Sequence, residues 1–386
     1  MSRHDTSRRN VLKLTGASAA FIGASGLSAG SGVGRNEVDA GSGSDHIEVN
    51  VGFANERGRA VAHSAAAEVR REFDEFDAMT LVLPVEVAEG LENDPDIRYV
   101  EENGRMEALD TYPWGVRRVY ADEAHHDGYT GAGADVAIID TGIDPNHPDL
   151  APNMGGGECF VSCAGSCAAC WDDDQGHGTH VAGTVAAAQT GAGLIGVAPE
   201  ATLWAVKVLD SGGSGSFSDI AAGIRWSARQ GHDVANMSLG GTTHSSLVHD
   251  ACQYAQCQGT LLVAAAGNAG TPNSVLYPAA YPECVAVSAI DQNDDLAGFS
   301  STGPEVELTA PGVDITSTAA GGGTAVMSGT SMASPHVAGV GALVMARGQT
   351  ASQARLRLRN TAEDIGLAPH EQGHGLVDAY EATSGL

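Results

Sequence analysis

The feature that most constrains the fold is a regular alternation of short apolar runs with longer helical segments, which fills the sequence from about residue 108 onward. Apolar runs of this kind indicate buried strands, and the segments between them are long enough for helices. Strands are expected at 136–140, 203–209, 234–237, 261–266 and 285–290, and helices near 177–188, 217–230, 245–258 and 332–347. The alternation predicts an α/β fold, a mostly parallel sheet with helices on both faces and ligands at the carboxyl ends of its strands.

A smaller unit with a different pattern precedes the large one, between about residues 46 and 103. Its sequence predicts strand, helix, strand, helix and strand at 47–51, 60–73, 80–83, 85–91 and 97–100. The first strand alternates apolar and polar residues, and the first helix carries apolar residues at helical spacing. With roughly 60 residues, such an α+β domain is only marginally stable alone.

The N-terminal segment has the features of an export signal. Arg8 and Arg9 form a twin-arginine pattern, and an uncharged stretch rich in Ala, Gly and Ser follows from Leu14 to Gly34. This stretch is too weakly apolar for a membrane span, and no later run of about 20 apolar residues occurs in the sequence. We expect residues 1–40 to be a twin-arginine signal peptide, so that the protein is exported folded and becomes extracellular. The alternative is a chance Arg-Arg pair before a disordered tail.

The charge balance is strongly acidic, with 48 Asp and Glu against 20 Lys and Arg, for a formal net charge of −28. Such a balance opposes broad contact with phosphate backbones, so we expect no nucleic-acid partner. The basic residues are almost all arginine, because Lys13 and Lys207 are the only lysines. An acidic surface that is poor in lysine suits a protein that works in strong salt, where self-repulsion is screened.

Three motifs place an acid, a base and a hydroxyl at the expected ligand-binding edge of the sheet. Asp140 ends a strand in Ile-Ile-Asp-Thr-Gly, although taken alone it could close a turn. His177 opens a helix of small residues, and with His180 it could instead form a metal pair, but the glutamate of His-Glu-x-x-His is missing. Ser331 begins a long helix, where free backbone N–H groups favour an anion. Serine becomes a nucleophile when an imidazole takes its proton and a carboxylate fixes the imidazole tautomer.

In these motifs the sequence resembles the subtilisin-like serine peptidases, and the resemblance covers nearly all of the large unit, about 112–382. It implies the catalytic residues Asp140, His177 and Ser331, in the chain order that subtilisin has. The segment Ala-Ala-Ala-Gly-Asn-Ala-Gly at 264–270 matches the family's oxyanion-hole motif. Asn268 and the Ser331 backbone N–H would therefore stabilise the oxyanion of an acyl-transfer reaction, without a cofactor for catalysis.

The resemblance also implies where a substrate would bind. Two glycine-rich segments would clamp an extended polypeptide as neighbouring strands. They comprise Gly213, Ser214 and Gly215 on one side and Ser238, Leu239 and Gly240 on the other. Leu276 stands where the family often has a small residue at the base of its main specificity pocket, so we expect a shallower pocket.

The small unit resembles the family's ferredoxin-like propeptide, which assists folding and inhibits the enzyme. We expect a signal peptide at 1–40, a propeptide at 41–109 and a catalytic domain at 110–386, with self-cleavage between about Asn103 and Tyr112. The expected partners are extended polypeptide substrates and the chain's own propeptide, with no nucleic acid and no membrane, and we expect a monomer. The alternative from another class is a catalytically inactive peptide-binding module on the same fold.

Asp149 matches a position that often binds structural calcium in this family. Thr190, however, stands where an asparagine ligand is usual, and the loss of one oxygen ligand weakens a calcium site. A structural calcium and an exposed acid in a turn are therefore both open.

Seven cysteines are an unusual number for an exported protein. Four of them crowd into one insertion shortly before His177, namely Cys159, Cys163, Cys167 and Cys170. Two disulfides within this insertion are the preferred interpretation, and zinc is the alternative, although the spacing is not a common zinc pattern. Cys252 and Cys257 are too far around one helix to bridge easily, and Cys284 is expected to be a lone buried thiol.

Overall fold

The structure is a computed structural model that describes residues 46–103, 111–165, 167–191 and 193–386. The chain divides into two compact units, residues 1–106 and 107–386. The expected signal peptide and most of the expected cleavage region lie outside the described residues. Within the part of the chain that is described, no helix combines the length and the apolar composition that crossing a membrane requires.

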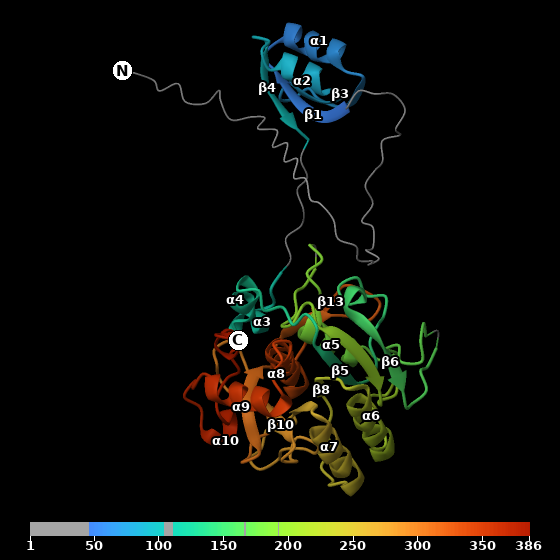
Figure 1. Cartoon of the computed structure of the whole chain (residues 1–386), viewed down its shortest axis with the longest axis vertical. Helices are drawn as coiled ribbons and strands as arrows, with labels where there is room; N and C mark the ends of the chain where they lie inside the picture. The colour runs from blue at the N-terminus through green and yellow to red at the C-terminus, as the bar shows by residue number, and fades with distance from the viewer. Residues whose placement is uncertain (1–45, 104–110, 166, 192) are drawn as a thin grey trace, which may run out of the picture. The chain divides into compact units, whose positions relative to one another are not determined.

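The N-terminal unit is an antiparallel four-stranded sheet with two helices (Figure 1). Its elements are β1 (His46–Phe53), α1 (Glu56–Ala65), β2 (Glu68–Phe73), β3 (Ala78–Pro84), α2 (Val85–Leu91) and β4 (Ile97–Glu102). The strand order is β2-β3-β1-β4, which puts the two most apolar strands in the middle. The core combines Val49 and Val51 of β1, Leu81 and Leu83 of β3, Ala62 of α1 and Ala88 of α2.

The expected helix at 60–73 is wrong in its second half. The helix ends at Ala65, Ala66 is extended (φ −73°, ψ 134°), and the chain continues as the edge strand β2. Val69 and Phe73 explain the error, because a spacing of four residues fits one face of a helix. In β2 a register shift between Val69 and Arg71 interrupts that pattern.

The C-terminal unit is built on seven parallel strands in the order β11-β10-β9-β8-β5-β7-β6. They are β5 (Asp135–Asp140), β6 (Met154–Cys159), β7 (Thr202–Lys207), β8 (Val234–Met237), β9 (Leu261–Ala265), β10 (Cys284–Ile290) and β11 (Val306–Pro311). An antiparallel hairpin adds β12 (Ile315–Thr318) and β13 (Thr324–Met327). The expected fold class is confirmed, and β6 and β11 extend the sheet beyond the five strands that the sequence predicted.

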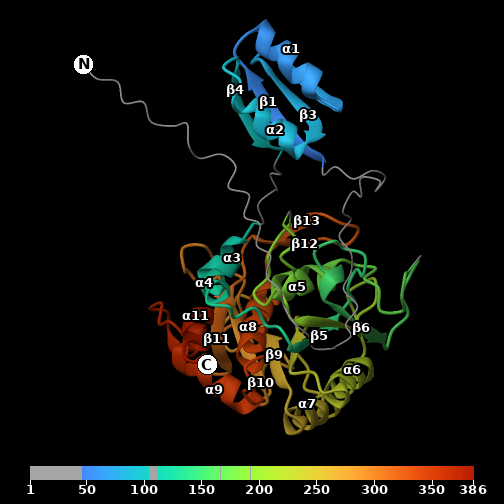
Figure 2. The same cartoon turned by 45° about the horizontal axis from the view of Figure 1, so that its top comes forward.

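Helices cover both faces of the sheet, and each face has its own apolar core. Alternate residues of β5 point to opposite faces. Val136 and Ile138 pack with α5 (His177–Ala186) and α8 (Thr330–Met345), whereas Ala137 and Ile139 pack with α6 (Phe217–Gln230) and α7 (Ser246–Gln258). In Figures 1 and 2, α6 and α7 lie side by side and away from α8. The remaining helices are α3 (Trp114–Arg118), α4 (Ala121–His126), α9 (Ala351–Thr361), α10 (Pro369–Gln372) and α11 (Ala379–Thr383), with a 3-10 turn at Ala151–Asn153.

Candidate active site

Asp140 and His177 meet at the carboxyl end of the central strand. Asp140 is the last residue of β5 and is completely buried, while His177 is the first residue of α5 and keeps 24% of its side chain exposed. Their atoms Oδ1 and Nδ1 lie 2.7 Å apart. The same Oδ1 also accepts from the Thr141 amide at 2.7 Å, and this bond helps to hold the carboxylate against the imidazole.

The surroundings of His177 favour its protonated form. Burial alone would lower the pKa of His177, but the charge and hydrogen bond of Asp140, together with the charge of Asp173, raise it. The ring can therefore accept a proton on Nε2 more readily than a free imidazole does, while Asp140 keeps the other proton on Nδ1.

Asp173 stabilises the turn that precedes His177, and it was not among the residues predicted from the sequence. Its Oδ1 accepts from the Gly176 amide (2.8 Å) and from the Thr141 hydroxyl (2.9 Å), and its Oδ2 accepts from the amide (2.8 Å) and hydroxyl (2.6 Å) of Thr179. One carboxylate therefore joins the end of β5 to the first turn of α5. Its position four residues before His177 was the available signal.

Ser331 lies in the first turn of α8, next to the end of β8. Its hydroxyl donates to the Ser238 carbonyl at 3.1 Å, and the Ser238 hydroxyl donates back to the Ser331 carbonyl at 2.8 Å. In the described residues the hydroxyl is therefore turned toward Ser238, and hydrogen bonds of this kind commonly change partner when a substrate arrives.

Asn268 follows β9 with its amide orientation fixed by Thr330. The Asn268 Oδ1 accepts from both the amide and the hydroxyl of Thr330, each at 2.9 Å, and the Thr330 hydroxyl oxygen accepts from the Gly267 amide at 3.0 Å. Because the carbonyl oxygen is occupied, the NH₂ group of Asn268 is left as a donor beside Gly329. Thr330 is a second residue that the sequence analysis missed, although it stands directly before Ser331.

A cavity of about 490 Å³ opens beside His177. It is lined by Gly213, Ser214 and Gly215 and by Ser238, Leu239 and Gly240, the six residues expected to bind substrate backbone. Its apolar wall includes Leu209, Phe217, Ile220, Val248 and Tyr281. Leu276 does not line this cavity. It packs against Gly240 and Gly267, where an added Cβ would come within 2.9 Å and 2.7 Å of its side chain.

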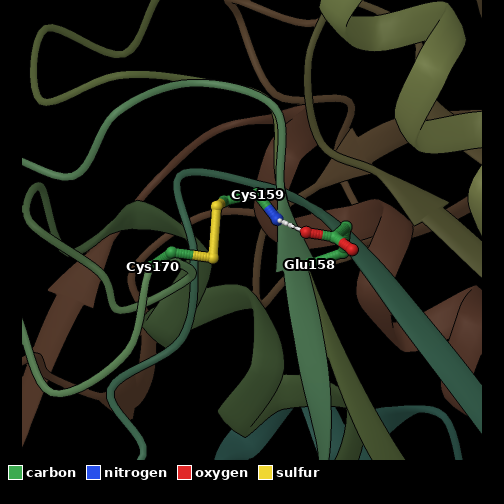
Figure 3. Close-up of side chains that lie close together, drawn as sticks. All are labelled: Glu158, Cys159 and Cys170. Carbon is green, nitrogen blue, oxygen red and sulfur yellow. Dashed lines mark hydrogen bonds between the residues drawn. A yellow bond between two sulfur atoms is a disulfide. The ribbon is translucent and has the colours of Figure 1, made fainter.

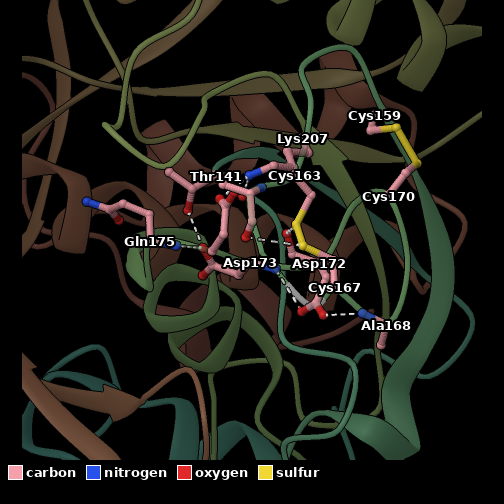
Figure 4. Close-up of a disulfide and its surroundings, with 12 residues drawn as sticks. Thr141, Cys159, Cys163, Cys167, Ala168, Cys170, Asp172, Asp173, Gln175 and Lys207 are labelled. Atoms are coloured by element: carbon pink, nitrogen blue, oxygen red, sulfur yellow. Dashed lines mark hydrogen bonds and ion pairs between the residues drawn. A yellow bond between two sulfur atoms is a disulfide. The ribbon is translucent and has the colours of Figure 1, made fainter.

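The cysteine-rich insertion leads directly into the turn before His177. Its sulfur atoms are paired as Cys159–Cys170 and Cys163–Cys167 (Figure 4). Among the described residues, the one group of three possible metal ligands is Glu158, Cys159 and Cys170, and both of its sulfurs are shared in a disulfide (Figure 3). With the sulfurs paired, the insertion offers no thiolate to zinc.

Two further expectations on cysteines and acids are corrected. Cys284 is not a lone thiol, because its Sγ lies 4.0 Å from the Sγ of buried Cys252, which α7 brings against β10. Asp149 is not an exposed turn acid, because it is only 7% exposed. Its two carboxylate oxygens accept from the Thr190 hydroxyl (3.1 Å) and the Leu194 amide (3.3 Å). The exposed acid is therefore excluded, and a structural calcium at Asp149 stays a prediction.

Comparison with known proteins agrees with this arrangement. Residues 131–375 match the model of the subtilase family. The chain is 44% identical over 327 residues to a thermostable alkaline protease of Halalkalibacterium halodurans, which covers 84% of this chain and 88% of the relative. It is 45% identical over 319 residues to the M-protease of Shouchella clausii (82% of each chain) and 41% identical over 335 residues to subtilisin E of Bacillus subtilis (85% of this chain and 86% of the relative). The chain therefore belongs to the subtilase family and is a subtilisin-like serine endopeptidase.

Proposed function

We propose that Asp140, His177 and Ser331 form the catalytic triad of this endopeptidase. The observation that carries the proposal is the 2.7 Å contact between Asp140 Oδ1 and His177 Nδ1, at the edge of the sheet where α8 begins. Asp140 holds the imidazole in the tautomer that leaves Nε2 able to take the proton of Ser331.

The reaction then proceeds in two halves. Ser331 Oγ attacks the peptide carbonyl carbon while His177 Nε2 takes its proton, and His177 returns that proton to the leaving amine, which gives an acyl-enzyme. Water attacks the acyl carbon with His177 again as the base, and Ser331 regains its proton. In both halves the Asp140 carboxylate stabilises the imidazolium, in agreement with the raised pKa of His177.

Asn268 supplies the oxyanion hole together with the Ser331 backbone N–H. The support for this role is that Thr330 occupies the Asn268 carbonyl oxygen, so that only the NH₂ group can face the developing charge. A preorganised donor of this kind stabilises the transition state more than the ground state.

Extended polypeptides are the substrates that fit the cavity. Gly213–Gly215 and Ser238–Gly240 both line it, and glycine-rich segments of this kind suit the addition of a substrate strand. Leu276 packs against Gly240, one of the residues that line the cavity, and from there it would limit the depth of the specificity pocket.

Maturation and export complete the proposal. Residues 1–40 would direct folded export through the twin-arginine pathway, and residues 41–109 would act as a propeptide that inhibits the enzyme until it cleaves itself. The mature, monomeric enzyme of residues 110–386 would then be extracellular, where both disulfides of the insertion are stable. The net charge of −28 supports work in strong salt.

Ser331→Ala tests this proposal. We expect no casein cleavage and a propeptide that stays attached, as measured by mass spectrometry of protein expressed in a protease-free host. The wild type should lose casein cleavage when it is treated with a serine-directed phosphonate. Cleavage that resists both changes would contradict the triad, and a wild type without activity would favour the inactive peptide-binding module.

A further inference from the structure

The largest completely buried side chain in the described part of the molecule is a lysine. Lys207 ends β7, is 0% exposed, and is the only lysine between residues 110 and 386. Its ammonium group donates to the carbonyl oxygen of Thr141 (2.5 Å), to Asp174 Oδ1 (2.6 Å) and to the carbonyl oxygen of Leu209 (3.1 Å). An ammonium group has three donors, so every one of them is used.

The acceptors of Lys207 belong to segments that build the active site. Thr141 follows Asp140 and donates its amide to Asp140 Oδ1. Leu209 lines the substrate cavity. Asp174 stands in the turn before His177, so a single ammonium group joins the segments of the acid, the base and the substrate cavity.

The disulfide-bonded insertion holds the acidic partner of Lys207. The second oxygen of Asp174 accepts from the Ala164 amide at 2.5 Å, and Ala164 lies between the bonded cysteines. In Figure 4, Asp172 Oδ2 accepts from the Ala168 amide, at 2.7 Å. Burial alone would raise the pKa of Asp174, but the Ala164 amide and the Lys207 ammonium group together lower it. Asp174 is thus held as a carboxylate, with its side chain only 6% exposed.

We propose that Lys207 and Asp174 are positioning residues for the peptidase reaction. Their buried ion pair fixes Thr141, and through it Asp140, against His177, and the disulfide-bonded insertion acts on catalysis through Asp174. This inference rests on the proposed function, because it takes Asp140 and His177 as the catalytic pair.

The ion pair has an electrostatic signature that packing alone does not have. The charged or titratable groups that act on His177 are Asp140, Asp173 and His180, and the pair of Lys207 and Asp174 adds two further charges that offset each other. Asp174→Asn leaves a cation, which opposes protonation of His177. Lys207→Met leaves an anion, which favours it. Buried charges are screened only weakly by salt, so the two shifts persist in a saline assay.

The first experiment measures kcat, KM and the pH profile of kcat/KM on an extended peptide anilide, per active site titrated with a serine-directed phosphonate. We expect kcat to fall at least about tenfold in each variant, because small displacements of catalytic groups are costly. The acid limb should move to lower pH in Asp174→Asn and to higher pH in Lys207→Met, by about 0.3 pH units or more. Asp174→Asn keeps an acceptor for Lys207, so it provides a folded variant even where Lys207→Met does not.

The control is Arg359→Met, which breaks a partly buried ion pair with Glu307 between α9 and β11. It should keep the wild-type kcat and acid limb. An unchanged kcat in Asp174→Asn, or acid limbs that stay in place or move the same way in both variants, would overturn the positioning role. Where Ser331→Ala is inactive, such a result rejects only this inference. An active Ser331→Ala variant would reject the proposed function itself.

The second experiment tests the route through the insertion with a double-mutant cycle. Removing one disulfide by Cys163→Ala with Cys167→Ala should lower kcat at least about threefold in the wild type. In the Asp174→Asn background the same change should alter kcat by less than about 1.5-fold. Equal effects in the two backgrounds would overturn the link between the insertion and catalysis.

Discussion

Replacing His232 by phenylalanine is expected to make the enzyme more resistant to unfolding by acid. His232 is 3% exposed and packs against the rings of Trp204 (centroids 5.0 Å apart) and Trp226 (5.2 Å). Neither ring nitrogen has a hydrogen-bond partner in the described residues. Burial lowers the pKa of His232 to about 4, although the charge of Asp135 acts in the opposite direction. A phenyl ring keeps the aromatic packing and removes the titration.

The magnitude follows from the difference between the folded and unfolded pKa. An unfolded histidine titrates near 6.5, so between pH 6.5 and pH 4 the unfolded chain binds a proton that the folded chain excludes. The stability that goes with a neutral His232 is therefore complete above pH 6.5 and is lost as the pH falls toward 4. Between pH 8 and pH 5 this loss amounts to about 2 kcal/mol of unfolding free energy.

The assay compares urea unfolding at pH 8 and pH 5, at constant salt, with mature enzyme inactivated by a serine-directed phosphonate to prevent self-digestion. The loss of unfolding free energy between the two pH values should be smaller by about 2 kcal/mol in His232→Phe than in the wild type. His126→Phe changes an exposed histidine and should keep the wild-type pH dependence. An identical pH dependence in His232→Phe and the wild type would refute the reasoning.

Three further predictions concern catalysis, salt and export. Asn268→Ala should lower kcat by about 10²- to 10³-fold with little change in KM, because the lost interaction forms only in the transition state; steady-state kinetics on a peptide anilide check this. Residues 110–386 carry 29 acidic and nine basic side chains, a net charge of −20. Because salt screens the repulsion among these charges, the melting temperature and the rate of casein cleavage should rise between 0.1 and 4 M sodium chloride. Flat curves would contradict this prediction. Arg8→Lys combined with Arg9→Lys should leave precursor inside the cell, and equal secretion of variant and wild type on an immunoblot would disprove the twin-arginine route.

The sheet could be predicted only where its strands are continuous apolar runs. β6 was not predicted because three of its six residues are glycine, so its sequence is not an apolar run. β11 was not predicted because it contains Glu307, a charged residue that is only 7% exposed. That charge is tolerated because Arg355 and Arg359, about 50 residues later, bind it with N–O distances of 2.5 and 2.7 Å. A local pattern cannot show a partner that the fold supplies.

The residues of the candidate site also fall into two groups, those that the sequence predicted and those that it did not. Asp140, His177 and Ser331 lie in short motifs that resemble those of subtilisin-like peptidases, so the sequence alone predicts them as candidates. The support of these residues comes from contacts between distant segments. In the sequence, Lys207 is an ordinary residue of a predicted strand. Its contacts with Thr141 and Asp174 are visible only in the folded structure. Cys284 was expected to stand alone for the same reason, since nothing in its neighbourhood along the chain indicates Cys252.

The wholly parallel sheet of the C-terminal unit bears on how long the enzyme survives its own activity. No two neighbouring strands can pair through a tight hairpin, and Val136 of β5 must find Val234 of β8 across nearly 100 residues of chain. Such long-range pairing makes folding slow, and at a given equilibrium stability a slower folding rate means an equally slower unfolding rate. A peptidase among copies of itself is digested through molecules that have opened, so its working lifetime is governed by how rarely one opens. The strand order that brings Asp140 against His177 therefore also delays self-digestion.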